Sequence, residues 1–494
     1  MKKTLSRTAV ILFWLIVWQM VALRVNNRIL LAGPTDVCVR IWEELRQSSF
    51  YASVAGSLMR IMAGFLLGML LGAAVGACAF FFRAIKNLLE PVILAMKSVP
   101  VAAFVILVLI WSGSKNLAIP ISFLVVFPYF YIHTLTGLAE TDAGQLAFAR
   151  VCGMRRINRL LYVYRPALAP YILSAARVTI GMSFKSGIAA EVIGVPEFAI
   201  GTRLYMSKVY LDTAGVLAWT VVVVLLSFLC EKIMIGLLNA LFSMHIRPLS
   251  GRGKSGLRVN VTYKAQGITI PAMRKTYQGK TVVDLPEITM EKGGRIALVG
   301  ESGSGKTTWL KMLMGLVEPD EESAGADSQH SVRQGTIAAC PTKKRRMARI
   351  KAGAMRKRGA SEIPHISPAF QEDCLFMTQT TEDNVRMVCD GKNVGRIREC
   401  LDLLLPDKTA KQPAAQLSGG MMRRTAVIRA VLAGGDLLLL DEPFRGLDTE
   451  NKKRLAAFIL KNQENRTLIV TAHDESEASL FAPEKNVFLQ NLTL

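Results

Sequence analysis

The first half of the chain runs repeatedly through apolar segments that are long enough to cross a lipid bilayer. A membrane-spanning helix needs about 20 predominantly apolar residues, and sliding-window hydropathy identifies such stretches. Hydropathy places six of them, at residues 8–23, 54–82, 91–112, 117–138, 171–195 and 213–243. The sequence therefore predicts an all-α, polytopic membrane domain with six transmembrane helices.

The first apolar segment could instead be a signal peptide, because it follows Lys2, Lys3 and Arg7. No small-residue cleavage site follows it, and the chain continues through Arg24, so we expect a first span. Six spans are an even number, so they return the chain to the side of the membrane on which it started.

Basic residues indicate which side that is. Arg83 and Lys86 follow the second segment, five arginines lie at 150–165 after the fourth, and Arg247 follows the sixth. Cytoplasmic loops are enriched in Lys and Arg, so we expect these loops and both termini in the cytoplasm. The loop 24–51 is an exception, since it holds four arginines on the expected outer side.

The chain is strongly basic, with 60 Lys and Arg against 38 Asp and Glu and a formal net charge of +22. Nucleic acid, anionic lipid or positive cytoplasmic loops could each account for that excess. The densest run is Lys343–Arg358, with nine basic residues in sixteen. It could bind RNA or anionic lipid, but no aromatic residues are interleaved, which favours a solvated insertion and argues against nucleic acid.

The second half has the composition of a soluble α/β domain. Residues 248–257 are rich in Gly and Ser and lack hydrophobic periodicity, as expected of a flexible linker. We therefore expect a membrane domain at 1–247, a linker at 248–257 and a soluble domain at 258–494, with a basic insertion at about 320–362.

A glycine-rich loop lies between a predicted strand, Ile296–Val299, and a predicted helix that includes Trp309. The loop has the pattern G-x-x-x-x-G-K-[ST], in which backbone N–H groups converge on phosphate, the lysine reaches the β and γ phosphates and the hydroxyl binds Mg²⁺. The residues predicted to bind nucleotide are Gly300, Glu301, Ser302, Gly303, Ser304, Gly305, Lys306, Thr307 and Thr308.

Two acidic residues follow a second apolar strand, Leu437–Leu440. Asp441 is placed to bind Mg²⁺, and Glu442 is placed to polarise the attacking water. Two acids at a strand end are common in proteins, but together with the phosphate loop they predict an α/β P-loop NTPase domain that uses ATP and Mg²⁺.

The order of the remaining motifs resembles that of the ATP-binding cassette (ABC) transporter ATPases over about Val259 to Leu494. The segment Leu417–Met421 reads Leu-Ser-Gly-Gly-Met and is similar to the family signature. The resemblance implies a Q-loop glutamine, a D-loop aspartate, a switch histidine and an adenine-stacking aromatic, at Gln371, Asp448, His473 and Tyr277 respectively. It also implies that Gln371 joins Thr307 and Asp441 as a Mg²⁺ ligand.

The resemblance implies a homodimer as well. In the family, the signature residues of one cassette complete the ATP site of a second, and here they are Ser418, Gly419 and Gly420. One chain supplies one cassette, so we expect a second copy of this chain as partner. Met421 replaces the glutamine that is common in the signature, and we expect this change to tune ATP hydrolysis without abolishing it.

The loop after the fourth apolar segment is similar in spacing to the coupling motif of bacterial importer permeases. The residues aligned with the motif are Ala147, Ala149, Gly153 and Pro166, and of these Ala147 stands where the motif has its leading glutamate. Such a loop would fold as a short helix–turn–helix and seat in a groove of the ATPase domain.

Residues 183–194 and 210–213 resemble permeases of the nitrate, sulfonate and taurine importer family, which includes transporters of thiamine-precursor pyrimidines. The resemblance covers about 60–238 and implies a type I importer fold in a bacterial cytoplasmic (inner) membrane. It also implies a small-molecule solute and a separate extracytoplasmic solute-binding protein. An ABC exporter and a membrane-anchored regulatory ATPase are the rival interpretations, and neither explains the coupling motif.

Among the ionisable residues in or beside the apolar segments are Lys97, His133, Lys185 and Glu191. Ionisable groups in a span are costly and point to a pathway, a gate or a buried pair. Lys97 and Lys185 could attract an anion. Alternatively, Lys185 pairs with Glu191, or the lysines extend to the membrane surface.

Overall fold

The computed structural model describes residues 2–27, 29–250, 262–264, 267–301, 303–320, 365–389, 391–481 and 485–488. Ser302, most of the predicted linker and the basic insertion with Lys343–Arg358 lie outside these residues. The chain forms two compact units, Met1–Thr141 with Tyr164–Met244, and Asp142–Val163 with His245–Leu494. The loop 142–163 therefore belongs, by its contacts, to the second unit and not to the membrane domain in which the sequence places it.

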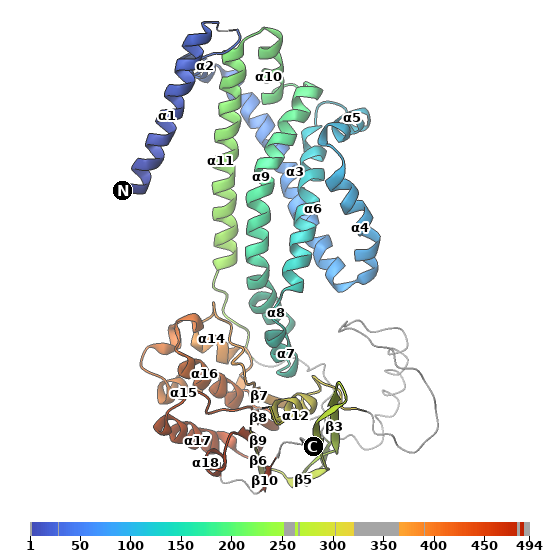
Figure 1. Ribbon diagram of the computed structural model, residues 1–494, viewed down its shortest axis with the longest axis vertical. Coiled ribbons are helices and arrows are strands. Elements are labelled where there is room, and N and C mark those ends of the chain that lie inside the picture. Colours follow the sequence, from blue (N-terminus) through green and yellow to red (C-terminus); the bar gives the residue numbers. More distant parts are fainter. Residues whose placement is uncertain are drawn as a thin grey trace. The chain divides into compact units, whose positions relative to one another are not determined.

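The first unit is helical (Figure 1). Its helices are α1 (Lys2–Val25), α2 (Pro34–Leu45), α3 (Ser48–Phe81), α4 (Arg83–Ser98), α5 (Val101–Ser112), α6 (Ala118–Ala139), α9 (Arg165–Gly194), α10 (Ile200–Val209) and α11 (Thr213–Ser243). Four segments are long and apolar enough to cross a membrane, namely α3, α6, the stretch Arg156–Gly194 that ends in α9, and α11. A fifth is counted only if α4 and α5 are one bent span, so the predicted number of six is not reached among the described residues.

The segment 91–112, where the sequence predicts a span, is bent, because α4 and α5 meet at an angle of 106°. The break falls at Val99 and Pro100. Proline has no N–H to continue the helical ladder, and its ring disfavours the helical conformation of the residue before it. The segment is thus either a broken span or a re-entrant loop.

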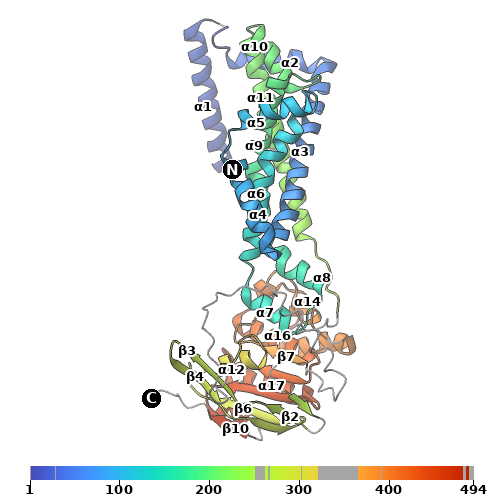
Figure 2. The same cartoon turned by 90° about the vertical axis from the view of Figure 1, so that its right-hand side faces the viewer.

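The centre of the helical unit is built by α3, α6 and α9, which lie side by side in Figures 1 and 2. Every fourth residue of one face of α3 is glycine, from Gly64 to Gly76. A Cβ added at Gly64 would lie 2.3 Å from the carbonyl oxygen of Ile119, and one at Gly72 would lie 2.6 Å from that of Phe127. Small residues at this spacing let two helix backbones approach closely in a membrane.

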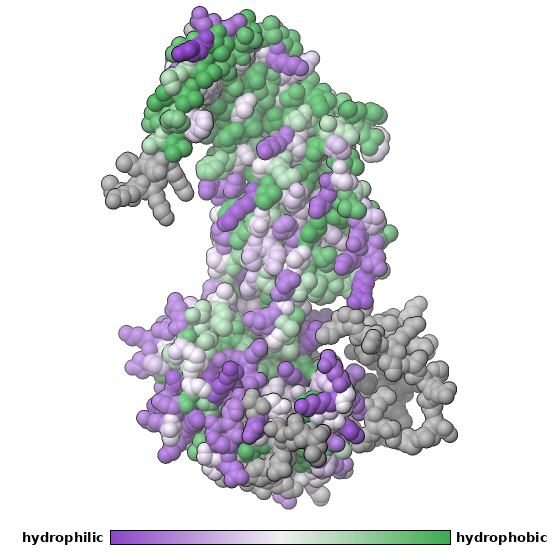
Figure 3. Space-filling view, viewed as in Figure 1, coloured by the Kyte–Doolittle hydropathy of each residue, from purple (hydrophilic) through white to green (hydrophobic). Residues whose placement is uncertain are grey.

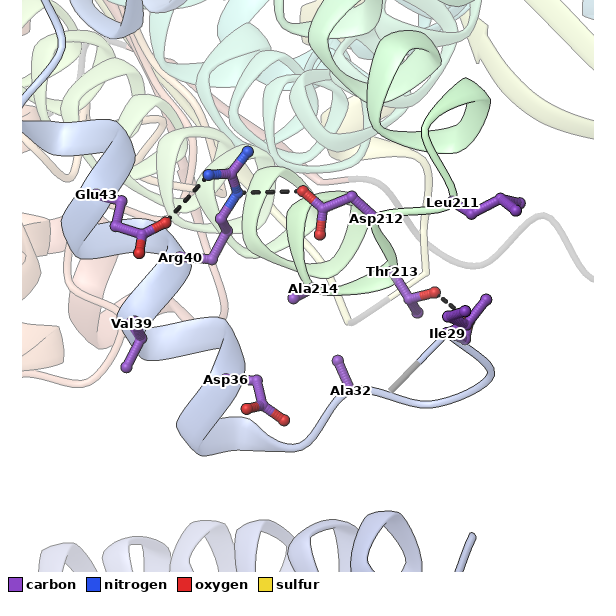
Figure 4. Close-up of a pocket in the computed structure, with 10 residues that line it drawn as sticks. All are labelled: Ile29, Ala32, Asp36, Val39, Arg40, Glu43, Leu211, Asp212, Thr213 and Ala214. Carbon is purple, nitrogen blue, oxygen red and sulfur yellow. Dashed lines mark hydrogen bonds and ion pairs between the residues drawn. The ribbon is translucent and has the colours of Figure 1, made fainter. Parts of the chain in front are cut away.

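An ion-pair network joins α2 to the start of α11 around a cavity of about 450 Å³ (Figure 4). Arg40 Nε lies 3.1 Å from Asp212 Oδ2, and Arg40 Nη1 lies 3.1 Å from Glu43 Oε2. The network fixes the amphipathic helix α2 against the membrane helices.

The second unit contains a parallel sheet of order β10-β6-β9-β8-β7. Its strands are β6 (Arg295–Val299), β7 (Ile366–Ala369), β8 (Leu437–Leu440), β9 (Thr467–Ala472) and β10 (Lys485–Phe488). Strands β7, β8 and β9 are buried at every residue, because helices or other strands cover both faces of the sheet. The carboxyl ends of these strands meet at one edge, where ligands of such sheets bind.

Two smaller sheets and several helices complete this unit. The strands are β1 (Thr262–Lys264), β2 (Gly267–Ile270) and β5 (Ile288–Glu291) in one antiparallel sheet, and β3 (Met273–Tyr277) and β4 (Lys280–Leu285) in a hairpin. The helices are α7 (Ala143–Val151), α8 (Arg156–Arg159), α12 (Lys306–Leu313), α14 (Thr381–Arg386), α15 (Ile397–Leu404), α16 (Gly419–Leu432), α17 (Thr449–Gln463) and α18 (Glu475–Ser479). Hydrophilic residues dominate the visible surface of this unit, whereas hydrophobic ones cover much of the helical unit (Figure 3).

Candidate functional site

The phosphate loop joins the end of β6 to the start of α12. Gly303 and Gly305 both have φ of +89°, which favours glycine. At Gly305 a Cβ would also lie 2.3 Å from the carbonyl oxygen of Val282. The loop therefore delivers its backbone N–H groups to the N-terminus of α12, where an anion is favoured.

Lys306 is buried, and its ammonium group donates to the carbonyl oxygens of Gly300 and Glu301. Burial lowers the pKa of Lys306, while Glu442 and Asp441 act in the opposite direction. Ser304 Oγ is buried and has no hydrogen-bond partner among the described residues. A hydroxyl left in this way is suited to donate to a phosphate oxygen.

Asp441 follows β8 and is held by two threonines. Its Oδ1 accepts a hydrogen bond of 2.8 Å from Thr471 Oγ1, and its carboxylate also accepts one from the hydroxyl of Thr307. Burial raises the pKa of Asp441, and the two hydrogen bonds partly oppose that rise. The direct contact of a carboxylate with a hydroxyl brings together two oxygen ligands of the kind Mg²⁺ prefers, so these residues fit that ion.

Two other predicted residues, Gln371 and His473, lie next to the same carboxylate oxygen of Glu442. Its Oε2 lies 3.3 Å from Gln371 Nε2 and 3.4 Å from His473 Nε2. Gln371 follows β7 and His473 follows β9, so the neighbours of β8 in the sheet supply both contacts. Glu442 has φ of +48°, a strained conformation that is common at functional sites, and its N–H donates to Thr471 Oγ1.

The signature and D-loop residues lie at helix N-termini on the surface. Ser418 caps α16 by accepting from the N–H of Met421, and Asp448 caps α17 by accepting from the N–H of Asn451. Hydrogen bonds that Asp448 accepts from the backbone and the side chain of Asn451 lower the pKa of Asp448. Gly419 and Gly420 form the first turn of α16.

The side chain of Met421 packs against an apolar cluster that includes Leu375 and Leu417. This contact accounts physically for an apolar residue at the position where the family commonly has glutamine.

Tyr277 ends β3 with its ring half-exposed, and Lys275 Nζ lies 5.8 Å from the ring centroid. An exposed ring at this place is available for stacking on a base.

Two buried arginines of α16 were missed by the sequence analysis. Arg423 donates to the carbonyl oxygens of Phe370, Asp441 and Glu442 and to Asp373 Oδ1 at 2.9 Å. Arg429 donates to the carbonyl oxygens of Asp373 and Cys374. Only their position in an otherwise apolar stretch of helix could have drawn attention to them.

The loop 142–163 contacts the cassette through α7 (Figure 2). Phe148 and Ala149 are fully buried in a cluster with residues such as Phe376 and Met387. The ring of Phe148 also lies under the guanidinium group of Arg429. Ala147 is half-buried next to this cluster and is not part of it.

The two remaining residues of the coupling motif lie at a turn and at a helix start. Gly153 has φ of +60° in the turn after α7. Pro166 lies in the first turn of α9, directly after the π-helical turn Leu160–Tyr164.

The structure does not bring Lys97, His133, Lys185 and Glu191 together. Glu191 is fully buried and pairs with Arg60 at 3.1 Å, so the expected alternative of a Lys185–Glu191 pair is wrong. Ser57 Oγ also donates to Glu191, at 2.6 Å. The partner of Glu191 is thus an arginine on α3, while Lys185 lies exposed on another face of α9.

Lys97 and His133 each have a local explanation. Lys97 lies in the last turn of α4, where the helix dipole favours a cation. His133 Nδ1 donates to the carbonyl oxygen of Tyr129, one turn earlier in α6, at 2.9 Å.

Two family models match the chain. Residues 64–241 match the inner membrane component of binding-protein-dependent transport systems, and residues 284–445 match the ABC transporter family. The first match lies mostly in the helical unit, and the second lies in the unit that holds the parallel sheet.

Curated relatives match the cassette. The sulfate/thiosulfate import ATP-binding protein of Nephroselmis olivacea is 31% identical over 45% of this chain and 60% of its own length. The Fe(3+) ions import ATP-binding protein of Pseudomonas fluorescens is 32% identical over 45% of this chain and 59% of its own length. The chain thus spans about 60% of the length of these relatives.

A solved dimeric structure of a bacterial ABC transporter cassette is 23% identical and has a TM-score of 0.32, covering 45% of this chain and 93% of its own. The two family matches, over residues 64–241 and 284–445, together cover more than half of the chain and show that it belongs to the ABC transporters, with a binding-protein-dependent permease domain and an ABC ATPase domain in one polypeptide.

Proposed function

We propose that this protein is the fused permease and ATPase subunit of an importer that uses ATP hydrolysis to bring a small solute across the bacterial cytoplasmic membrane. The observation that carries the proposal is the joining of a binding-protein-dependent permease to a cassette whose Glu442, Gln371 and His473 converge on one point.

The residues divide the work of ATP hydrolysis. Lys306 and the N–H groups before α12 bind the phosphates, and Tyr277 stacks on the adenine. Glu442 accepts a proton from the attacking water, while Gln371 and His473 fix its carboxylate in place. Mg²⁺, held by Asp441, Thr307 and Gln371, would neutralise charge on the phosphates.

The working unit is a homodimer. Ser418 is exposed at the N-terminus of α16, with Gly419 and Gly420 beside it. A second copy can bring the same residues against the nucleotide bound at Lys306. ATP then draws two cassettes together, and hydrolysis releases them.

The loop 142–163, which contains the coupling motif, carries this motion to the permease. Phe148 is buried in the cassette, and the loop is continuous with α9, whose first turn holds Pro166. A movement of α16 and the segment around Asp373 therefore shifts the loop and the helix that follows it. Ala147 removes one charged contact of the importer motif, and the apolar contacts of Phe148 replace it.

The solute belongs to the class carried by the nitrate, sulfonate and taurine importers, with a thiamine-precursor pyrimidine or a similar heteroaromatic as the alternative. The similarity of 183–194 and 210–213 to those permeases supports this assignment. Similarity of the cassette to its relatives does not indicate the solute, because one relative is named for sulfate and thiosulfate and the other for Fe(3+). A separate extracytoplasmic binding protein delivers the solute, and both termini lie in the cytoplasm.

The test is ATP hydrolysis by the protein in lipid nanodiscs, with and without the binding protein encoded nearest its gene, loaded with candidate solutes. Stimulation by one loaded binding protein supports import and identifies the solute class. A rate that ignores every binding protein but rises with a solute alone would favour export. RNA-dependent hydrolysis without solute flux would favour a regulatory ATPase.

A further inference from the structure

Two cationic side chains lie on an exposed face of α9, within an apolar span. Arg177 and Lys185 are both exposed, and eight residues correspond to about 12 Å along a helix. Gly181 lies between them, and a Cβ added there would meet no atom within 4 Å. We call Arg177, Gly181, Lys185 and the exposed Ala189 the α9 stripe. Residues four apart lie on the same side of a helix, so the stripe is continuous.

The charges of the stripe are not neutralised within the described part of the chain. Neither Arg177 nor Lys185 has a hydrogen-bond or ion-pair partner there, whereas Glu191 on the same helix is buried and paired with Arg60. The helical unit thus satisfies its buried acid and leaves two bases facing outward.

Lys185 lies too deep in the apolar segment to reach a lipid headgroup. The segment 171–195 places it fourteen residues from one end and ten from the other, which is about 21 Å and 15 Å along a helix. The hydrocarbon core is about 30 Å thick, so this position is near its middle. Charged residues at such depth almost always face a protein interior or a water-filled cavity.

We propose that the α9 stripe lines a water-filled passage for a small oxyanion, with Arg177 and Lys185 as its anion-binding side chains. The proposal rests on the permease function argued above and names the chemical class of its solute, a carboxylate, sulfonate or similar oxyanion. The planar guanidinium of Arg177 suits two oxygens of such a group, and the ammonium of Lys185 acts as a compact charge. Two weak sites in series let an anion enter and leave.

The test measures the access of water-soluble thiol reagents to a cysteine at position 185. The Lys185→Cys variant of the full chain is placed in nanodiscs and treated with an anionic sulfonatoethyl or a cationic trimethylammonioethyl thiosulfonate. Peptide mass spectrometry then locates the modification, so that native cysteines do not interfere. The matched control is Leu225→Cys, at an exposed apolar position of α11.

We expect the Lys185→Cys variant to react at least tenfold faster than the Leu225→Cys variant with the anionic reagent. Adding Arg177→Gln should reduce the ratio of the anionic to the cationic rate by about threefold or more, because a charge some 12 Å away acts in opposite directions on the two reagents.

Three results would overturn the passage. They are a rate at position 185 no higher than at position 225, a ratio of rates that Arg177→Gln leaves unchanged, and a ratio that this substitution raises. ATP hydrolysis by the same preparations reports separately on the proposed function. Active hydrolysis with an unreactive position 185 contradicts only the proposed passage. Absent hydrolysis in the unsubstituted protein contradicts the proposed transport function.

Discussion

The guanidinium carbon of Arg429 lies 3.7 Å from the centroid of the Phe148 ring, inside the cassette unit. Arg429 is fully buried, and burial lowers its pKa to about 10, which still leaves it charged at neutral pH. Its N–H groups also donate to the carbonyl oxygens of Asp373 and Cys374. Arg429 of α16 therefore contacts both the loop 142–163 and the segment that follows Gln371.

Replacing Phe148 should weaken the coupling of hydrolysis to transport. Phe148→Leu keeps an apolar side chain but loses the aromatic face, and a desolvated cation–π contact is worth about 2 kcal/mol. We expect stimulation of ATP hydrolysis by the loaded binding protein to fall at least fivefold, with basal hydrolysis changed less than twofold. Phe458→Leu, in the buried core of the cassette away from the loop, is the matched control. Equal loss of stimulation in both variants would contradict the role of Phe148.

Glu442→Gln should stop turnover while leaving nucleotide binding intact. The amide keeps the shape of the side chain but cannot accept the proton of the attacking water, and a general base contributes about 10²–10⁴-fold. Phosphate release and binding of labelled ATP by the purified protein provide the measurement. Normal phosphate release would remove Glu442 from the role of base.

Arg423 should position the catalytic carboxylate without contacting nucleotide. It ties the carbonyl oxygens of Asp441 and Glu442 to the side chain of Asp373. Removing one partner of a buried charged pair costs about 3–5 kcal/mol, so Arg423→Lys is tested beside Arg423→Gln. We expect kcat to fall at least tenfold in Arg423→Gln, with the Kd for ATP unchanged and partial recovery in Arg423→Lys.

The control for Arg423 is Arg466→Gln. Arg466 also donates to several backbone carbonyl oxygens, but it lies at the start of β9, at the other end of that strand from His473. If this variant lowers kcat as much as Arg423→Gln does, the effect of Arg423 is general destabilisation. A changed Kd for ATP in the Arg423 variants would also contradict a positioning role.

Asp441→Asn should stabilise the cassette while abolishing Mg²⁺-dependent hydrolysis. Burial raises the pKa of Asp441, so the folded state binds a proton more tightly than the unfolded state. The carboxyl therefore lowers stability as pH rises from the unfolded pKa of about 3.9 through the folded pKa, and the cost is complete above it. We expect the variant to have the higher Tm at pH 7.5 and an equal Tm at pH 3.5. A lower Tm at pH 7.5 would contradict this sign.

The sequence predicts the phosphate loop well because a strand, a glycine turn and a helix follow one another locally. The convergence of Gln371, Glu442 and His473 was anticipated only through family resemblance, since three separate strands supply them. The angle between α4 and α5 was missed because hydropathy counts apolar residues and ignores the backbone effect of Pro100. The Arg60–Glu191 pair was missed because its partners are 131 residues apart.

The glycine face of α3 sets a mechanical condition on the transport cycle. At Gly64, Gly72 and Gly76 the nearest atom of α6 is a backbone carbonyl oxygen, and at Gly68 it is the Cβ of Val126, so little side-chain freedom separates α3 from α6. We expect the two helices to move together as a rigid pair, because sliding of α6 along α3 would push its carbonyl oxygens against the α3 backbone at these glycines. Any opening and closing of the permease has to be taken up by hinges elsewhere, and the break at Val99 and Pro100 is the place in this unit where the chain already bends.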